Sequence, residues 1–294
     1  AVTSARKTVF FGPDQPVTVV GERINPTGKK QLSEGLKQGK LSEVRRLAVE
    51  QLANGAHILD VNVGVPGIDE AKTMVDAVKL LSNVAEAPLC LDSSSPEALE
   101  AALRLYPGRA LINSISAEKV KIERLLPIAR KYGAMFILLP LSEAGVPELA
   151  EERYEIIQYI INEAKAWGFT NTDIVVDGLV MSVSSNQNAA IETLKVIKWF
   201  TEKLDCATVI GLSNVSFGLP NRGYINAAFL AMAIGHGLCM AIANPNSELL
   251  MAMKAASDVL TVRDKNSYNY ISKYGEGLQE KTKKTEQKTN LTAE

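Results

Sequence analysis

The sequence predicts a single-domain α/β protein, a closed (β/α)8 TIM barrel, from three observations. The chain has 294 residues, and α/β barrels commonly need about 250. Short runs rich in Val, Ile or Leu recur without polar alternation, as expected of strands that are buried on both faces. Helical stretches separate these runs, and eight such units fit a closed barrel better than the alternative, an open doubly wound sheet.

The eight apolar runs are the predicted strands. They cover residues 17–20, 56–61, 88–91, 110–112, 134–139, 174–176, 207–212 and 238–243. Residues 42–54 place their apolar side chains on one stripe and stop at Gly55, which predicts a helix. Ser95 before Pro96 is typical of a helix N-cap, and we expect the same of Ser116.

The barrel is expected to cover residues 16–265. Residues 1–15 are polar and irregular, and we expect them to lie across the bottom of the barrel. Residues 266–294 are predicted to form a polar tail that is mobile or helical. From Gly275 onward this tail has no aromatic side chain, so it cannot bury enough apolar surface to offset its ordering entropy.

Composition excludes several classes of partner. Lys and Arg number 32 against 33 Asp and Glu, so no overall charge draws the chain to nucleic acid or to an anionic membrane. Cys90, Cys206 and Cys239 lie far apart inside apolar runs, which argues against disulfides and favours a reducing cytoplasm. The longest apolar stretch, around 229–242, is interrupted by glycines and is too short to span a bilayer.

Polar side chains follow seven of the eight predicted strands. The endings read GERIN (21–25), DVNVG (60–64), LDSSS (91–95), INSIS (112–116), VVDG (175–178), GLSNVS (211–216) and ANPN (243–246). In a (β/α)8 barrel the carboxyl ends of the strands meet at one mouth, where active sites of this fold lie. One Asp or Asn there is usually a turn former or a helix cap. Turn chemistry alone would use more Gly, Ser and Thr, so the set indicates a binding site.

These residue types favour a flat nitrogen heterocycle such as a pterin. Its amidine edge can pair with a carboxylate through two parallel hydrogen bonds, while asparagines satisfy the remaining donors and acceptors. The predicted strands contain no lysine, which disfavours a Schiff-base aldolase, and the site offers no spare cation for a phosphate. We expect His57 and His236 to be structural, and we expect no bound metal because no His, Cys and carboxylate cluster has ligand spacing.

Five motifs in order carry a family resemblance: GERINPTG, ILDVNVG, LDSSS, PGRALINSIS and GLSNVSFGLPNR. They resemble the pterin-binding methyltransferases, namely the methyltetrahydrofolate-to-corrinoid-protein methyltransferases and the folate domain of cobalamin-dependent methionine synthase. The resemblance covers about residues 17–260. It implies a barrel with folate in its mouth, tetrahydrofolate or 5-methyltetrahydrofolate as substrate, cobalamin carried by a partner corrinoid protein, and a homodimer. Dihydropteroate synthase is a more distant resemblance, because its terminal basic motifs and its opening loop are not found.

The same resemblance implies the site residues. The pterin-binding set is Glu22, Asn25, Asp92, Asn113, Asp177, Asn214 and Arg222. By this resemblance Asp92 and Asp177 pair with the pterin edge, and Arg222 lies at the lip of the site. Asp60 and Asn62 are second candidates.

One departure concerns Gly178, which stands where relatives often have a proline. The aspartate before it is kept, but the change is expected to loosen the loop.

By the resemblance, Asn214 is the catalytic residue and faces N5, the nitrogen that carries the methyl group. N5 must take a proton as the methyl group leaves, and a strong fixed acid is unnecessary when the cobalt of a corrinoid is the attacking group. An amide can accept from protonated N5 or donate to it, and so stabilise the developing charge without titrating. The direction of transfer stays open. Two other readings also stay open: a folate-binding module or fragment of a larger cobalamin-dependent synthase, and an unrelated sugar-phosphate barrel.

Overall fold

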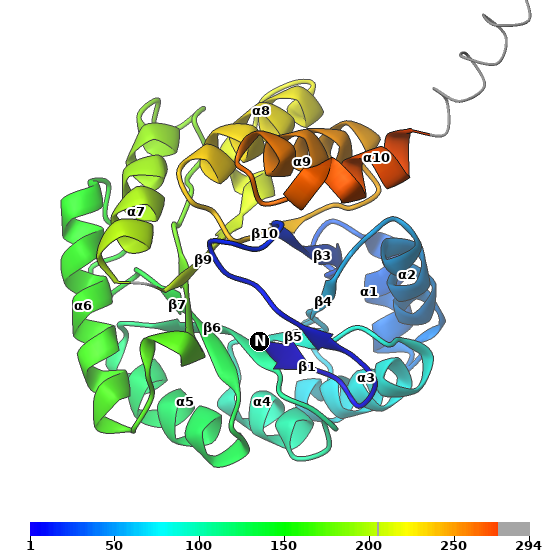
Figure 1. The fold of residues 1–294 in the computed structure, drawn as a ribbon. Helices are drawn as coiled ribbons and strands as arrows, with labels where there is room; N and C mark the ends of the chain where they lie inside the picture. Colours follow the sequence, from blue (N-terminus) through cyan, green and yellow to red (C-terminus); the bar gives the residue numbers. More distant parts are fainter. Residues whose placement is uncertain (205, 276–294) are drawn as a thin grey trace, which may run out of the picture.

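Eight parallel strands close into a barrel in the computed structural model, which describes residues 1–204 and 206–275 (Figure 1). The order around the barrel is β10-β3-β4-β5-β6-β7-β8-β9, so strands that follow one another in sequence are neighbours. The strands are β3 (Thr18–Ile24), β4 (Ile58–Val61), β5 (Leu89–Asp92), β6 (Leu111–Ser116), β7 (Met135–Leu139), β8 (Ile174–Asp177), β9 (Ala207–Gly211) and β10 (Met240–Ala243). The predicted single-domain (β/α)8 barrel is confirmed.

Helices surround the barrel (Figure 1). They are α1 (Lys30–Lys37), α2 (Ser42–Ala53), α3 (Glu70–Val84), α4 (Pro96–Leu103), α5 (Lys119–Tyr132), α6 (Ala150–Ala166), α7 (Ala189–Lys203), α8 (Arg222–Gly235), α9 (Glu248–Leu260) and α10 (Tyr268–Tyr274). Three short 3-10 turns are η1 (Asn171–Asp173), η2 (Leu212–Ser216) and η3 (Lys265–Ser267). In the described ranges, no helix combines the length and the apolar character needed to cross a membrane.

Two strands run four residues further than their apolar runs. β3 and β6 each continue four residues past the predicted end, because backbone pairing with a neighbouring strand resumes at Ile24 and at Ile115 after a register shift. This overturns the N-cap assigned to Ser116, which ends β6 and donates its hydroxyl to Glu118 at 2.6 Å. The N-cap at Ser95 is confirmed, since its Oγ accepts from the Ala98 amide at 3.2 Å.

An antiparallel hairpin replaces the irregular segment expected for residues 1–15. β1 (Val2–Thr3) pairs with β2 (Thr8–Val9), and the Thr3 amide donates to the Arg109 carbonyl at 3.0 Å. Val2 and Val9 are buried in one cluster with side chains that fill the barrel interior. The hairpin therefore plugs the amino-terminal end of the barrel, the end that faces the viewer in Figure 1.

The expected C-terminal tail is described only in part. Helix α10 lies inside the range 266–294, and residues 276–294 lie outside the described residues.

Replacing Gly108 with alanine is expected to push the hairpin off the barrel. A side-chain carbon at this position would lie 2.8 Å from the Thr3 carbonyl carbon, and backbone cannot give way cheaply. The free energy of unfolding should fall by about 1–3 kcal/mol, as for other overpacked sites. Urea unfolding measures this change. Gly12→Ala is the matched control because nothing lies within 4 Å of its added carbon, and equal losses in the two variants would contradict the explanation.

Candidate functional site

A cavity of about 360 Å³ opens at the carboxyl end of the strands. It is lined by six of the seven predicted residues: Glu22, Asn25, Asp92, Asn113, Asp177 and Asn214. The second candidate Asp60 also lines it. Residues far apart in the chain thus meet, as in the contact between Ser213 and Glu22, which are 191 positions apart.

Carboxylates and amides alternate on the floor of the cavity. The Asn113 side chain donates from Nδ2 to Asp60 at 3.1 Å, and the Asn62 side chain donates to Asp92 at 3.0 Å. Asn62 does not line the cavity, and its contact instead fixes the orientation of Asp92. The floor therefore presents acceptor oxygens whose positions are set by neighbouring amides.

Burial raises the pKa of the carboxyl groups that line the cavity. It raises the pKa of Asp60 and of Asp92, and the two charges oppose each other's ionisation. Burial also raises the pKa of Asp177 to about 7, and it raises the pKa of Glu22 against the hydrogen bond from Ser213. Perturbed carboxyl groups that share a cleft are typical of functional sites, and hydrogen-bond donors from a ligand would favour their ionised forms.

The loop that holds Asp177 is braced. The Leu179 amide donates to Asp177 Oδ1 at 2.7 Å, and buried Arg153 donates to the carbonyls of Gly178 at 3.0 Å and Leu179 at 2.9 Å. A side-chain carbon at Gly178 would lie 3.0 Å from Thr193 Cγ2. The expected loosening at Gly178 is wrong, because this position is tightly packed and its carbonyl is held by a buried guanidinium.

Asn214 lies in the turn η2, which follows β9. Ser213 donates its hydroxyl to Glu22 at 2.7 Å, and the Arg222 guanidinium donates to the Ser213 carbonyl and to Ser216 Oγ. Arg222 does not line the cavity but ties the turn to the start of α8. Asn214 is exposed, and within the described residues its side-chain amide has no hydrogen-bond partner. That amide is available to a ligand.

Two cations in the cavity wall were missed. Arg23 and Lys29 both line the cavity, so the statement that the site offers no spare cation is wrong. Lys29 donates from Nζ to the Asn25 carbonyl at 3.0 Å, while the Asn25 side chain accepts from the Thr27 amide at 2.9 Å. The signal was present in GERINPTGKK, where a tight turn after β3 returns a lysine to the mouth.

The asparagines after the last strand serve the scaffold. Asn246 contacts Asn54 at 3.1 Å and also donates to Glu50, so it fastens the end of β10 to α2. His57 is structural as expected: its Nδ1 accepts from the Val19 amide at 3.0 Å, and burial lowers its pKa to about 4. Within the described ranges no group of three or more His, Cys, Asp or Glu is arranged to hold a metal ion.

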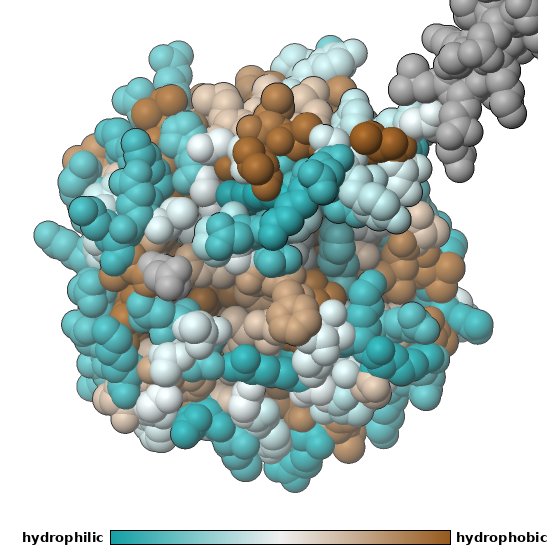
Figure 2. Space-filling view, viewed as in Figure 1, coloured by the Kyte–Doolittle hydropathy of each residue, from teal (hydrophilic) through white to brown (hydrophobic). Residues whose placement is uncertain are grey.

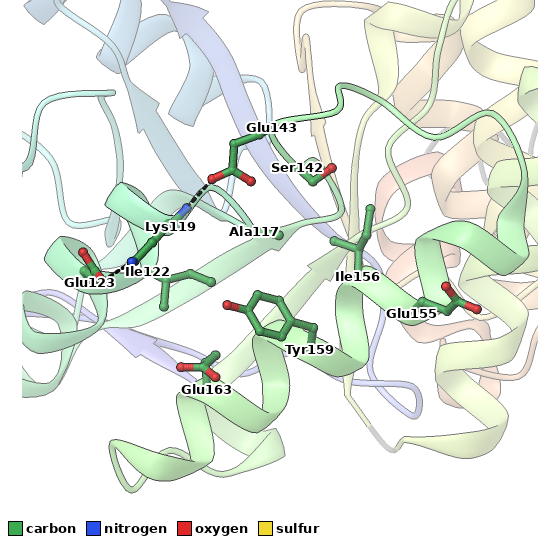
Figure 3. A pocket seen from close by; sticks show the side chains of 10 residues that line it. All are labelled: Ala117, Lys119, Ile122, Glu123, Ser142, Glu143, Glu155, Ile156, Tyr159 and Glu163. Atoms are coloured by element: carbon green, nitrogen blue, oxygen red, sulfur yellow. Dashed lines mark hydrogen bonds and ion pairs between the residues drawn. The ribbon is translucent and has the colours of Figure 1, made fainter.

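A larger hollow, of about 680 Å³, lies outside the barrel between α5 and α6 (Figure 3). Glu123, Glu143, Glu155 and Glu163 line it, and Lys119 there pairs with Glu123 at 3.7 Å. None of the predicted site residues lies in this hollow. The smaller cavity at the strand ends collects six of the predicted residues and lies where active sites of this fold are found, so it is the better candidate.

Comparison with known proteins identifies the family. The family described as pterin binding enzyme matches residues 21–244. The methylcorrinoid:tetrahydrofolate methyltransferase of Eubacterium limosum is 29% identical over 265 residues, which cover 88% of this chain and 96% of that protein. The methionine synthase of Mycobacterium tuberculosis is 30% identical over 264 residues, which cover 85% of this chain. The chain spans only 22% of the length of that synthase.

Solved structures share the fold. A dihydropteroate synthase of Coxiella burnetii, in complex with pteroic acid, superposes with a TM-score of 0.67 at 16% identity, covering 88% of this chain and 98% of that one. The dihydropteroate synthase of Yersinia pestis, with a pterine-sulfa conjugate, gives a TM-score of 0.64 at 15% identity, with 88% and 99% covered. At this identity the likeness shows the barrel architecture alone.

Proposed function

The chain belongs to the family of pterin binding enzymes, and on that premise we propose that it is a methyltransferase acting between N5 of tetrahydrofolate and the cobalt of a corrinoid protein. Membership in the family confirms the resemblance found in the motifs. One observation carries the proposal: buried carboxyl groups and amides share one cavity floor at the strand ends. Near full-length similarity to the Eubacterium limosum methyltransferase supports the reaction.

The cavity floor suits the pterin end of the substrate. Asp92 and Asp177 would accept hydrogen bonds from the ring N–H and amino groups, which are the donors that a buried carboxylate needs. Asn113 would satisfy a further ring atom, and Glu22 with Asn25 would complete the cradle from the end of β3. Such a fixed set of partners orients N5 toward the open mouth.

Asn214 is the residue proposed to assist at N5. When the methyl group leaves folate, the carbon–nitrogen bond breaks with its electron pair on N5, and N5 takes a proton. A corrinoid bound by the partner protein supplies the cobalt that exchanges the methyl group. The Asn214 amide would hydrogen-bond to N5 as its charge changes, and the turn η2, held by Arg222, would fix that amide in place. The same arrangement serves transfer in either direction.

Two measurements test the proposal. In a thermal shift assay, tetrahydrofolate should raise the melting temperature and inorganic phosphate should not, because a ligand stabilises only the fold that binds it. Steady-state methyl transfer between methyltetrahydrofolate and added cobalamin should then be observed. Folate binding without turnover would instead identify a passive folate-binding module, and protection by phosphate alone would identify a sugar-phosphate barrel.

The proposal includes a cytoplasmic homodimer. The burial of all three cysteines supports a reducing compartment. An apolar face on α8 and α9 supports self-association: Tyr224, Met232 and Leu260 are 71%, 45% and 82% exposed. Figure 2 shows hydrophobic side chains gathered over the ends of these helices, and exposed patches of this kind mark protein interaction sites.

Met232→Glu is expected to convert the proposed homodimer to monomer, because a charge buried in an apolar interface stays unpaired. Light scattering after size-exclusion chromatography measures the mass. Val120, which is 65% exposed on α5, supplies the control Val120→Glu. A wild-type chain that already runs as a monomer would refute the dimer.

A further inference from the structure

The cavity has opposite charges at its two ends. Asp60, Asp92 and Asp177 belong to strands and form the floor. Lys29 stands beyond the end of β3, in the turn that leads to α1, and Arg23 lies one residue before the last residue of that strand. The cavity therefore has acceptors on its floor and, in Lys29, a cation beyond the strand ends.

The two cations lack anionic partners. Among the residues that the structure describes, no carboxylate oxygen lies within 4.0 Å of a charged nitrogen of Arg23 or Lys29. Arg23 Nε is buried and has no hydrogen-bond partner. A buried donor without an acceptor is rare in native proteins. Arg23 also lines the cavity, so its positive charge has no competing anion in the described part of the chain and is available to an anionic ligand.

Lys29 adds a second independent observation. Its ammonium group donates one N–H to the Asn25 carbonyl at 3.0 Å, and the other two N–H groups can donate to a ligand in the cavity. Burial lowers its pKa, the nearby Arg23 charge lowers it further, and Glu22 opposes both effects. Two cations held near each other in a partly buried wall repel, and a bound anion relieves this repulsion.

We propose that Arg23 and Lys29 form an anion subsite that binds the glutamate carboxylates of the folate tail. The inference rests on the proposed function and extends it to the part of the substrate outside the pterin ring. Folate carries hydrogen-bond donors on its pterin edge and carboxylates at the far end, so its polarity runs in the same order as that of the cavity. Guanidinium and ammonium groups are the usual partners of carboxylates. The subsite selects folates that carry glutamate over pteroates that lack it.

Calorimetry with two ligands tests this subsite. The ligands are 5-methyltetrahydrofolate and 5-methyltetrahydropteroate, which has the same pterin and benzoyl groups but no glutamate. The wild-type chain should bind the folate about 10- to 100-fold more tightly, the range of one or two hydrogen bonds to charged groups. Lys29→Met should bring the two affinities close together because it weakens binding of the folate. Its affinity for the pteroate should stay within about twofold of wild type.

A neighbouring lysine supplies the control. Lys30 pairs weakly with Glu34 at 3.9 Å, its side chain is 89% exposed, and it does not line the cavity. Lys30→Met should keep the full ratio although it removes the same net charge. Arg23→Gln is the second variant and should also reduce the ratio.

The outcomes separate the two proposals. Equal binding of the two ligands by the wild-type chain, or an unchanged ratio in folded Lys29→Met and Arg23→Gln, overturns the subsite and leaves the proposed function standing. Failure of both ligands to bind overturns the proposed function and the subsite with it.

Discussion

Replacing Asn214 with alanine is expected to slow methyl transfer by about two to three powers of ten and to weaken folate binding. That range is typical of one preorganised polar group aimed at a developing charge. Asn214 is exposed and its amide has no partner among the described residues, so the variant should keep the stability of the wild-type chain. The loss would then report chemistry and not folding. The measurement is the single-turnover rate with free cob(I)alamin, at a folate concentration that saturates the variant.

Asn188→Ala is the matched control for this experiment. Asn188 is also an exposed asparagine without a side-chain cap bond, and it lies before α7, outside the cavity. It should leave the rate unchanged. A single-turnover rate for Asn214→Ala equal to that of the wild-type chain would reject the proposed role at N5.

The second large effect is expected at Asp177. Asp177→Asn replaces two charge-assisted hydrogen bonds to the pterin edge with one acceptor and one badly placed donor, so folate affinity should fall about 100-fold. Because the pKa of Asp177 is raised to about 7, wild-type affinity should rise as the pH increases toward 7 and level off above it. The folate affinity of Asp177→Asn should not show the increase that ionisation of Asp177 causes. Calorimetric titrations from pH 5.5 to about 8.5 measure it.

The same substitution separates binding from folding. A raised pKa means that folded Asp177 keeps a proton that the unfolded chain has lost, so its contribution to stability declines as pH rises from about 4 to 7. Asp177→Asn has no such decline and should gain stability relative to wild type over that interval, by at most about 4 kcal/mol. Urea unfolding at both ends of the interval measures the gain. Parallel pH profiles of the two proteins would contradict the assignment.

Much of the barrel was readable from the sequence because strands buried on both faces leave continuous apolar runs. The strand ends were less accurate: Glu22 and Asn113 interrupt the apolar pattern, although each strand resumes its pairing beyond a register shift at these residues. The hairpin at residues 1–15 was missed because its strands have two residues each, too few for a period to be seen.

The cavity was predicted in outline because parallel strand ends must meet. Six of the seven named side chains line it, since each lies at or near the end of its strand. The side chain of Arg222 turns back onto η2 and does not line the cavity, and position in a loop does not show the direction of a long side chain. Arg23 and Lys29 were missed for the same reason.

The plug formed by Val2 and Val9 has a kinetic consequence. The filled barrel interior leaves the cavity open at one end only, so on the proposed function folate and the corrinoid protein would approach through the same mouth. Folate product would dissociate only after the corrinoid protein has dissociated. Folate substrate would have to bind before the corrinoid protein binds. This arrangement predicts an ordered binding mechanism, in which excess corrinoid protein slows turnover because it blocks the release of bound folate.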